Sequence, residues 1–212
     1  MDMSQSMSTA WHLSPLWVLA VVLVAVEELG LSRLTPRMGA DRARRWRRRG
    51  IAYDLIIIGL CVLDSSPLEG LSMEHLWLHM LIHVVEMFYV PAALVLCVPW
   101  LPALFSIRVD RRRRLLRAWQ MGKARWITRR VTKFVRSPLV GLIAFNLVMV
   151  LWHLPASMDA AGRSPELRSL LMTGSFVLGG WMFWRIILPS GPYRERGSLA
   201  QQAASVAATS LV

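Results

Sequence analysis

Three histidines follow one another at intervals of four residues in an apolar stretch of the chain, at His75, His79 and His83. Residues four apart lie on one face of an α-helix, so a helix here would carry a ladder of imidazoles, and Glu86 would continue the stripe. The stretch is long enough to cross a bilayer. Ionisable groups inside a membrane persist mainly where they pair, bind something or line a wet cavity. The ladder is therefore the first candidate for a functional site.

The chemistry that these side chains favour is metal binding. Imidazole and thioether groups together suit copper, and thioethers favour the cuprous ion. Two histidines four residues apart can bind one metal, and a further histidine ends a second apolar stretch. The sequence thus predicts a copper-ligand set of His75, His79, His83 and His153. The groups expected to support it are Met73, Met80, Glu86 and Met158.

The depths of the histidines along their helices lead to a geometric prediction. At a rise of 1.5 Å per residue, His83 would lie about 12 Å below His75. Imidazole nitrogens must lie about 2 Å from an ion that they share. Because His153 ends its apolar stretch near the outer surface, we expect it to approach His75 or His79 rather than His83. We expect Glu86 to hold His83 as a separate, deeper group.

Two other interpretations of these histidines stay open. Each imidazole could simply donate a hydrogen bond to a carbonyl or hydroxyl group in a packed helix. Alternatively, His79 or His83 could face His153 across two helices and hold a b-type haem. The chain contains no nucleotide-binding, serine-hydrolase or zinc-protease motif, so we expect no enzyme activity.

The elements that position these residues follow from an uneven distribution of charge. The chain of 212 residues is 55% hydrophobic, with a net charge of +12 and a mean hydropathy of +0.43. Of its 25 Lys and Arg residues, eight lie in 33–49 and twelve in 108–136. Apolar stretches near the ~20 residues that a membrane span needs separate these runs. This pattern predicts an all-α, polytopic transmembrane bundle of about five spans, at 15–31, 51–68, 72–98, 139–154 and 166–188.

The basic runs also predict the orientation of the spans. Lys and Arg concentrate in cytoplasmic loops, which places 33–49 and 108–136 inside and the N-terminus outside. We expect residues 1–190 to form one transmembrane domain and 191–212 a flexible cytoplasmic tail. The chain would then be a multi-pass protein of the inner membrane of a bacterium, with all five histidines toward the outer face.

The second basic run contains apolar residues among its charges. It could form a basic amphipathic helix on the anionic inner leaflet, or a solvated loop that only fixes the topology. Arg111, Arg112, Arg113 and Arg114 are the candidates for contact with the lipid surface. Because both runs adjoin apolar spans and neither forms an aromatic-interleaved recognition element, we expect no nucleic acid as a partner.

Two of the histidine segments resemble the multi-span CtaG family of cytochrome c oxidase assembly proteins. The residues His79-Met80-Leu81-Ile82-His83, followed by the Pro-Ala-containing run 90–96, are similar to one family segment. Trp152-His153-Leu154-Pro155 is similar to a second, and 180–184 to the family's closing aromatic segment. The resemblance extends over roughly 72–189.

This resemblance implies a non-enzymatic assembly factor that acts at the copper-insertion step. Its partners would be oxidase subunits, and other copper chaperones would be compatible with that role. Members usually carry another His pair before the closing segment, where this chain has Ser169 and Thr173. The alternative is a copper transporter, which would need polar residues along a path through the inner half of the membrane. These would come from Glu86, Glu27, Glu28 and Asp54, although the last three could simply pair with the adjacent arginines at the level of the lipid headgroups.

Overall fold

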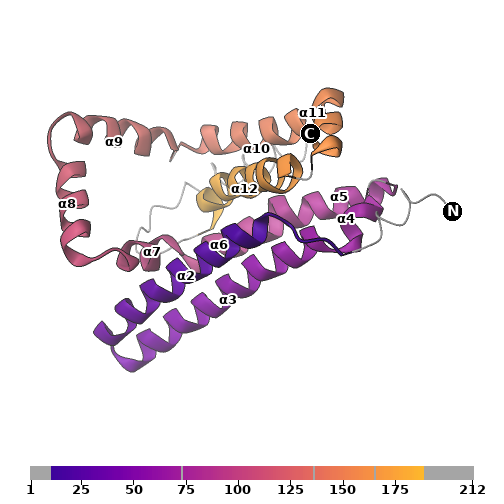
Figure 1. Ribbon diagram of the computed structural model, residues 1–212. Coiled ribbons are helices and arrows are strands. Elements are labelled where there is room, and N and C mark those ends of the chain that lie inside the picture. Colours follow the sequence, from indigo (N-terminus) through magenta and orange to yellow (C-terminus); the bar gives the residue numbers. More distant parts are fainter. Residues whose placement is uncertain (1–10, 73, 136, 165, 189–212) are drawn as a thin grey trace.

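The computed structural model describes residues 11–188 except 73, 136 and 165, and all regular structure in this part is helical (Figure 1). The all-α prediction is therefore confirmed. The predicted cytoplasmic tail 191–212 lies outside the described residues, as does Met73.

Two long helices begin the fold as an antiparallel pair (Figure 1). Helix α2 covers Leu16–Leu34, a short 3-10 turn η1 covers Thr35–Arg37, and α3 covers Ala40–Ser65. Most of the basic run 33–49, predicted as a loop, is thus helical. The reason is local: arginine and alanine are good helix formers, and Asp41 in the first turn of α3 complements the helix dipole.

The histidine segment and the closing segment each form a nearly continuous helix that contains a π-helical turn. The first consists of α5 (Leu76–Val84), η2 (Val85–Tyr89) and α6 (Val90–Cys97). The second consists of η3 (Leu167–Met172) and α12 (Thr173–Ile187). A π-helical turn inserts an extra residue and is frequent at functional sites.

These two composite helices are long and apolar enough to cross a membrane. A third span results if Arg125–Val135 and Pro138–Trp152, which meet at 64°, count as one. Most of the predicted segment 15–31 lies in α2, and most of 51–68 lies in α3, with its last two residues in α4. Their passage through the membrane, the count of five spans and the orientation stay predictions.

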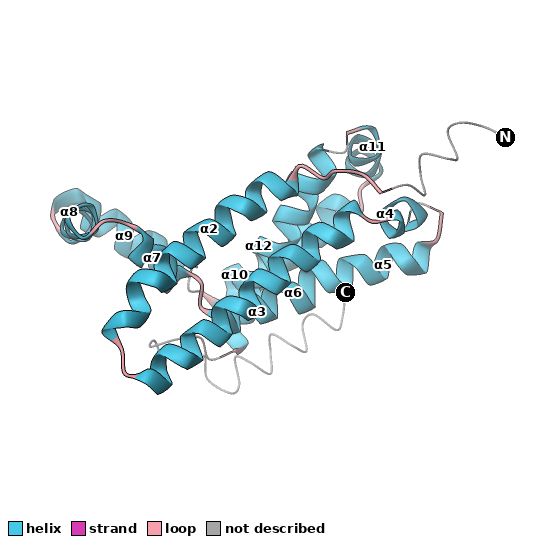
Figure 2. Ribbon diagram, turned by 60° about the horizontal axis from the view of Figure 1, so that its bottom comes forward, coloured by secondary structure: helices cyan, strands magenta, loops and turns pink. Residues whose placement is uncertain are grey.

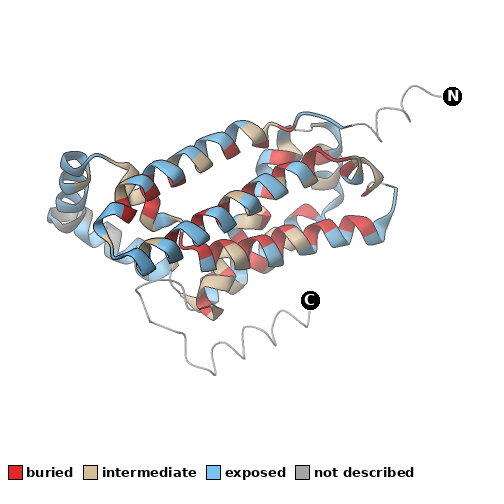
Figure 3. Ribbon diagram, turned by 90° about the horizontal axis from the view of Figure 1, so that it is seen from below, coloured by how far each residue is buried: buried red, intermediate tan, exposed pale blue. Residues whose placement is uncertain are grey.

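Six further helices complete the described part of the fold. They are α4 (Pro67–Ser72), α7 (Trp100–Ser106), α8 (Val109–Gln120), α9 (Gly122–Val135), α10 (Pro138–Trp152) and α11 (Pro155–Arg163). Helices α8 and α9 project from one end of the bundle (Figure 2), and their described residues are mostly exposed (Figure 3). The second basic run is therefore helical rather than an irregular loop, and its contact with lipid stays a prediction.

Close contacts hold η2, α10 and α12 together around the histidines. An aromatic cluster that includes Phe145, Phe176 and Phe183 fills the space between α10 and α12. On the other side of α12, a Cβ atom added to Gly180 would lie 2.2 Å from the Met87 carbonyl oxygen. Only glycine fits there, so α12 packs directly against η2 and positions the residues around the histidines.

Candidate metal centre

Two of the predicted ligands lie on one face of α5, as their spacing requires. The Nε2 atoms of His79 and His83 are 2.8 Å apart, and both residues are buried. The ring of His83 also packs against Phe176, with 4.6 Å between the ring centroids. At this separation one imidazole donates a hydrogen bond to the other, and a metal ion could replace the shared proton.

The third imidazole comes from the end of α10. Trp152, the last residue of that helix, donates its Nε1–H to Ser175 Oγ at 2.7 Å and so anchors the end of α10 to α12. His153 follows directly, and its Nδ1 lies 2.7 Å from the Met149 carbonyl oxygen. A carbonyl group can only accept, so Nδ1 carries the proton and Nε2 keeps its lone pair for a ligand.

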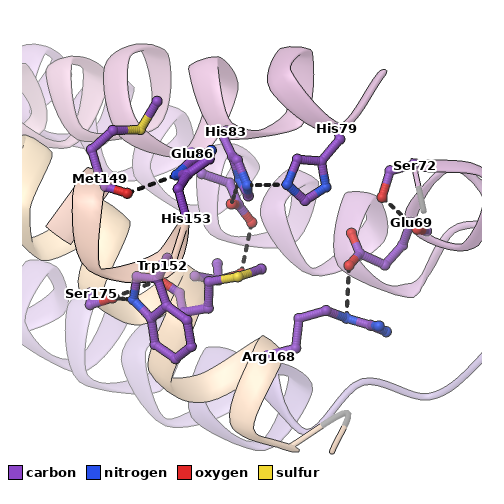
Figure 4. A network of polar contacts seen from close by, with 12 residues as sticks. Glu69, Ser72, His79, His83, Glu86, Met149, Trp152, His153, Arg168 and Ser175 are labelled. Atoms are coloured by element: carbon purple, nitrogen blue, oxygen red, sulfur yellow. Dashed lines mark hydrogen bonds and ion pairs between the residues drawn. The ribbon is translucent and has the colours of Figure 1, made fainter. Parts of the chain in front are cut away.

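The three imidazoles, here called the histidine trio (His79, His83 and His153), converge (Figure 4). One nitrogen atom from each can be chosen so that all lie within 4.8 Å of one another. Trigonal coordination with bonds of about 2 Å would place nitrogen atoms about 3.5 Å apart. Small side-chain rotations would therefore bring the trio into coordinating distance of one ion.

The predicted separation of His83 from His153 is wrong. The His153 ring centroid lies 5.6 Å from that of His83 and 6.3 Å from that of His79. The prediction treated the side chains as fixed at the depths of their Cα atoms. In the structure the imidazole of His79 reaches toward the next turn, so both α5 histidines meet His153 at a common level.

The expected ladder loses its first member. His75 is exposed and has an extended backbone as the residue before α5, so it does not share the face of His79 and His83. Its carbonyl oxygen instead accepts the first hydrogen bond of the helix, from the His79 N–H at 3.1 Å. Met80 is exposed on α5, and it is not among the residues that line the cavity beside the trio.

Glu86 lies beside His83, as the spacing suggested. Its Oε2 is 3.5 Å from His83 Nδ1, and its Oε1 accepts a hydrogen bond from Thr173 Oγ1 at 2.7 Å. All three side chains are buried. At this distance the contact between Glu86 and His83 is not a hydrogen bond, but a carboxylate in this place would favour the tautomer with the proton on Nδ1 and the lone pair on Nε2.

Ser169 and Thr173, at the positions where the resembled family carries its second His pair, both face the interior. Ser169 is fully buried, and its Oγ has no hydrogen-bond partner. Thr173 bonds Glu86 instead of offering a metal ligand. The described part of the chain thus contributes three histidines to the site rather than the four that the sequence predicted.

A small cavity adjoins the trio and leaves about 10 Å³ for the centre of a water molecule. That is room for about one water molecule or one ion, and far less than the several hundred Å³ of a typical organic cofactor site. Two thioethers line it together with the polar groups. Its principal lining residues are Glu69, Ser72, His79, His83, Glu86, Met158, Arg168 and Met172.

An ion pair between α4 and η3 closes this cavity on one side. Arg168 Nε lies 2.8 Å from Glu69 Oε1, and both side chains are largely buried (Figure 4). Burial raises the pKa of the Glu69 carboxyl to about 7, although the charge of Arg168 opposes the shift. The pair joins the first half of the chain to the second beside the histidines.

Sequence reasoning missed Glu69, Arg168 and Met172 as parts of this site. One available signal was the charge of Arg168 inside the predicted span 166–188, since a charged residue in a span usually has a partner there. The π-helical turn that directs Arg168 toward Glu69 has no comparable sequence signature.

Comparison with known proteins gives a family. A protein-family model described as cytochrome c oxidase caa3 assembly factor (Caa3_CtaG) matches residues 28–212. Searches of curated proteins and of solved structures found no match. The resemblance inferred from the two histidine segments is confirmed, and the matched region begins well before them. The chain therefore belongs to the cytochrome c oxidase caa3 assembly factor family.

Proposed function

We propose that this chain binds one cuprous ion at the histidine trio and presents it, at the outer face of the membrane, to a cytochrome c oxidase during assembly. The observation that carries the proposal is the convergence of His79, His83 and His153 from two separate helices to within 4.8 Å. Among the described residues, this is the one group of three or more His, Cys, Asp or Glu side chains with such geometry.

The surroundings favour copper over a hard cation. Imidazole nitrogens supply the converging atoms, and two thioethers, from Met158 and Met172, line the adjoining cavity. Magnesium and calcium require several oxygen ligands, whereas imidazole with thioether groups suits Cu(I). Glu86 would balance part of the ion's charge through His83, at 3.5 Å. The small cavity argues against haem between these helices.

A copper transporter is the second candidate, and one observation favours it. Glu27 is 2% exposed, and neither its Oε1 nor Asp54 Oδ1 has a hydrogen-bond partner. Among the residues that the structure describes, no ion pair with arginine satisfies these atoms, contrary to the expectation from the adjacent basic run. The buried carboxylate of Glu27 and the partly buried one of Asp54 could form an inner step for a cation. Copper uptake into proteoliposomes would distinguish transport from presentation at one face.

The test in cells replaces the gene by variants and measures assembled oxidase from its haem a spectrum, with and without added copper. We expect His79→Ala/His83→Ala to lower oxidase content at low copper, with partial recovery when copper is added. His75→Ala is the matched control and should behave as the wild type, because His75 lies outside the trio. Unchanged oxidase content in the double variant would refute the proposal. A haem Soret band in the purified chain would favour the haem alternative instead.

A further inference from the structure

We propose that the end of the molecule opposite the histidine trio carries a binding site for the phosphate group of an acidic phospholipid. A cavity of about 360 Å³ lies there, between the end of α2, η1, α7 and the start of α8. We call it the arginine pocket. The residues that define it are Arg33, Arg37, Phe105, Arg108 and Arg112.

The arginines are held around an aromatic ring. Arg112 lies over the Phe105 ring, 4.2 Å from its centroid, and Arg37 approaches the same ring at 5.9 Å. Arg33 donates a hydrogen bond to the Ser106 carbonyl oxygen. Stacking and hydrogen bonding restrict these long side chains, so less conformational entropy remains to be lost when an anion binds.

Close packing of the surrounding helices forms the pocket in advance. A Cβ atom added to Gly30 would lie 2.0 Å from the Pro102 carbonyl oxygen, so α2 and α7 meet backbone to backbone. Pro102 is buried in this contact. The contact lies one turn before Arg33 on α2 and three residues before Phe105 on α7. The two walls of the pocket are therefore fixed relative to each other.

The charge of the pocket selects an anion. Four guanidinium groups face one carboxylate, that of Asp110, among the lining residues. None of the ion pairs found among the described residues includes any of the four arginines. Guanidinium groups bind phosphate through paired N–H donors, which makes a phosphate group the best match to this set.

The position of the pocket favours a lipid over free phosphate. Its volume is in the range of small-molecule sites, and Phe105, Ile107 and Val109 give it an apolar wall next to the charges. It lies beside the end of α2, where α7 leaves the apolar bundle and continues into the basic helix α8 (Figure 1). Basic pockets at this level of a membrane protein can hold the headgroups of anionic lipids.

The test measures which lipid the full-length chain retains. The purified protein is incubated in micelles that contain equal amounts of phosphatidylglycerol and phosphatidylcholine, and native mass spectrometry counts the bound lipids. We expect wild type to retain phosphatidylglycerol in preference by at least about tenfold. Arg33→Gln/Arg112→Gln should bring that ratio close to one. Arg45→Gln/Arg48→Gln is the matched control, since both residues are exposed on α3 and neither lines the pocket.

Further arms distinguish the outcomes. Displacement of the lipid by millimolar inorganic phosphate would support the same chemistry with a soluble source of phosphate. Equal loss of the preference in both double variants would assign it to diffuse surface charge and overturn the proposal, as would no loss in either. The single variant Arg112→Gln retains the Arg33–Ser106 hydrogen bond and serves if the double variant does not fold.

Discussion

The two ends of this molecule place polar groups on the same kind of helical scaffold but arrange them for opposite ligands. At the histidine end, three imidazoles converge and a buried ion pair closes a cavity of about 10 Å³. At the arginine end, four guanidinium groups surround an open cavity of about 360 Å³. The first end suits one bare cation and the second a bulky anion.

This difference shows how charge can separate two sites on one small protein. A cuprous ion approaching the arginine pocket meets net positive charge, whereas the histidine end offers imidazole nitrogens and acidic groups. The two sites also lie beside different kinds of irregular helical turn. The π-helical turns η2 and η3 lie beside the histidine trio, and the 3-10 turn η1 lies beside the arginine pocket. The following predictions test whether the ends are independent.

The largest effect should come from the comparison of His83→Ala with His75→Ala. We expect His83→Ala to weaken Cu(I) binding by more than about 100-fold, beyond the usual cost of removing a group that only supports a ligand. His75→Ala should change binding little, because its side chain is exposed and outside the trio. Competition with a Cu(I) chelator of known affinity measures both.

Neither variant should alter the lipid preference at the arginine end. Equal weakening of Cu(I) binding by both substitutions would show that the trio is not the binding site. A loss of lipid preference in His83→Ala would show that the two ends depend on each other.

A second, smaller effect should follow from tightening the helix contacts at each end. Gly180→Ala would force a Cβ atom against the Met87 carbonyl oxygen, and Gly30→Ala against that of Pro102. Backbone atoms cannot move aside as a flexible side chain can, so each should destabilise the protein by about 1–3 kcal/mol. Gly59→Ala is the control, because nothing lies within 4 Å of its added Cβ. It should be neutral or stabilise α3 by about 0.5–1 kcal/mol.

The two functional readouts should separate in these variants. We expect Gly180→Ala to weaken Cu(I) binding and spare the lipid preference, and Gly30→Ala to do the reverse. Thermal unfolding in detergent gives the stabilities, with the two binding assays run on the same samples. If both variants impaired both readouts equally, the bundle would be responding as a single unit.

The sequence predicts the helices and the proximity of His79 to His83 well, for physical reasons. A spacing of four residues places His79 and His83 together on any α-helix, and an apolar run of the length of 76–97 favours a helix strongly. The charge runs also marked the helical connection α8–α9, although not its geometry. The resemblance of two short histidine segments was sufficient to identify the family, and the family model matches most of the chain.

What the sequence could not predict depends on where helices begin, bend and cross. Helix α5 starts at Leu76, which removes His75 from the ladder by a single residue. Such boundaries are the least certain feature of sequence-based assignment. The approach of His153 to His83 depends on the hydrogen bond between Trp152 and Ser175. The Glu69–Arg168 ion pair depends on the π-helical turn that contains Arg168. Both are tertiary features with no local periodicity.

The last effect concerns the ion pair that closes the histidine end, and it depends on pH. Burial raises the pKa of Glu69 from 4.5 to about 7, with Glu86 and Asp64 adding to the shift and Arg168 opposing it. Between these two pH values the folded state binds more protons than the unfolded state, so stability should fall as pH rises through this window. A shift of this size corresponds to at most about 3 kcal/mol.

Glu69→Gln should remove this contribution, because an amide does not titrate. We expect the melting temperature of wild type to decrease more between pH 5 and pH 8 than that of Glu69→Gln, with the difference confined to the window from 4.5 to 7. Glu74→Gln is a control, since Glu74 is exposed and does not line the cavity. If Glu69→Gln kept the wild-type slope, the pH dependence would belong to other groups. A weak slope in Glu69→Gln with unchanged lipid preference would place this pH-sensitive contact at the histidine end alone.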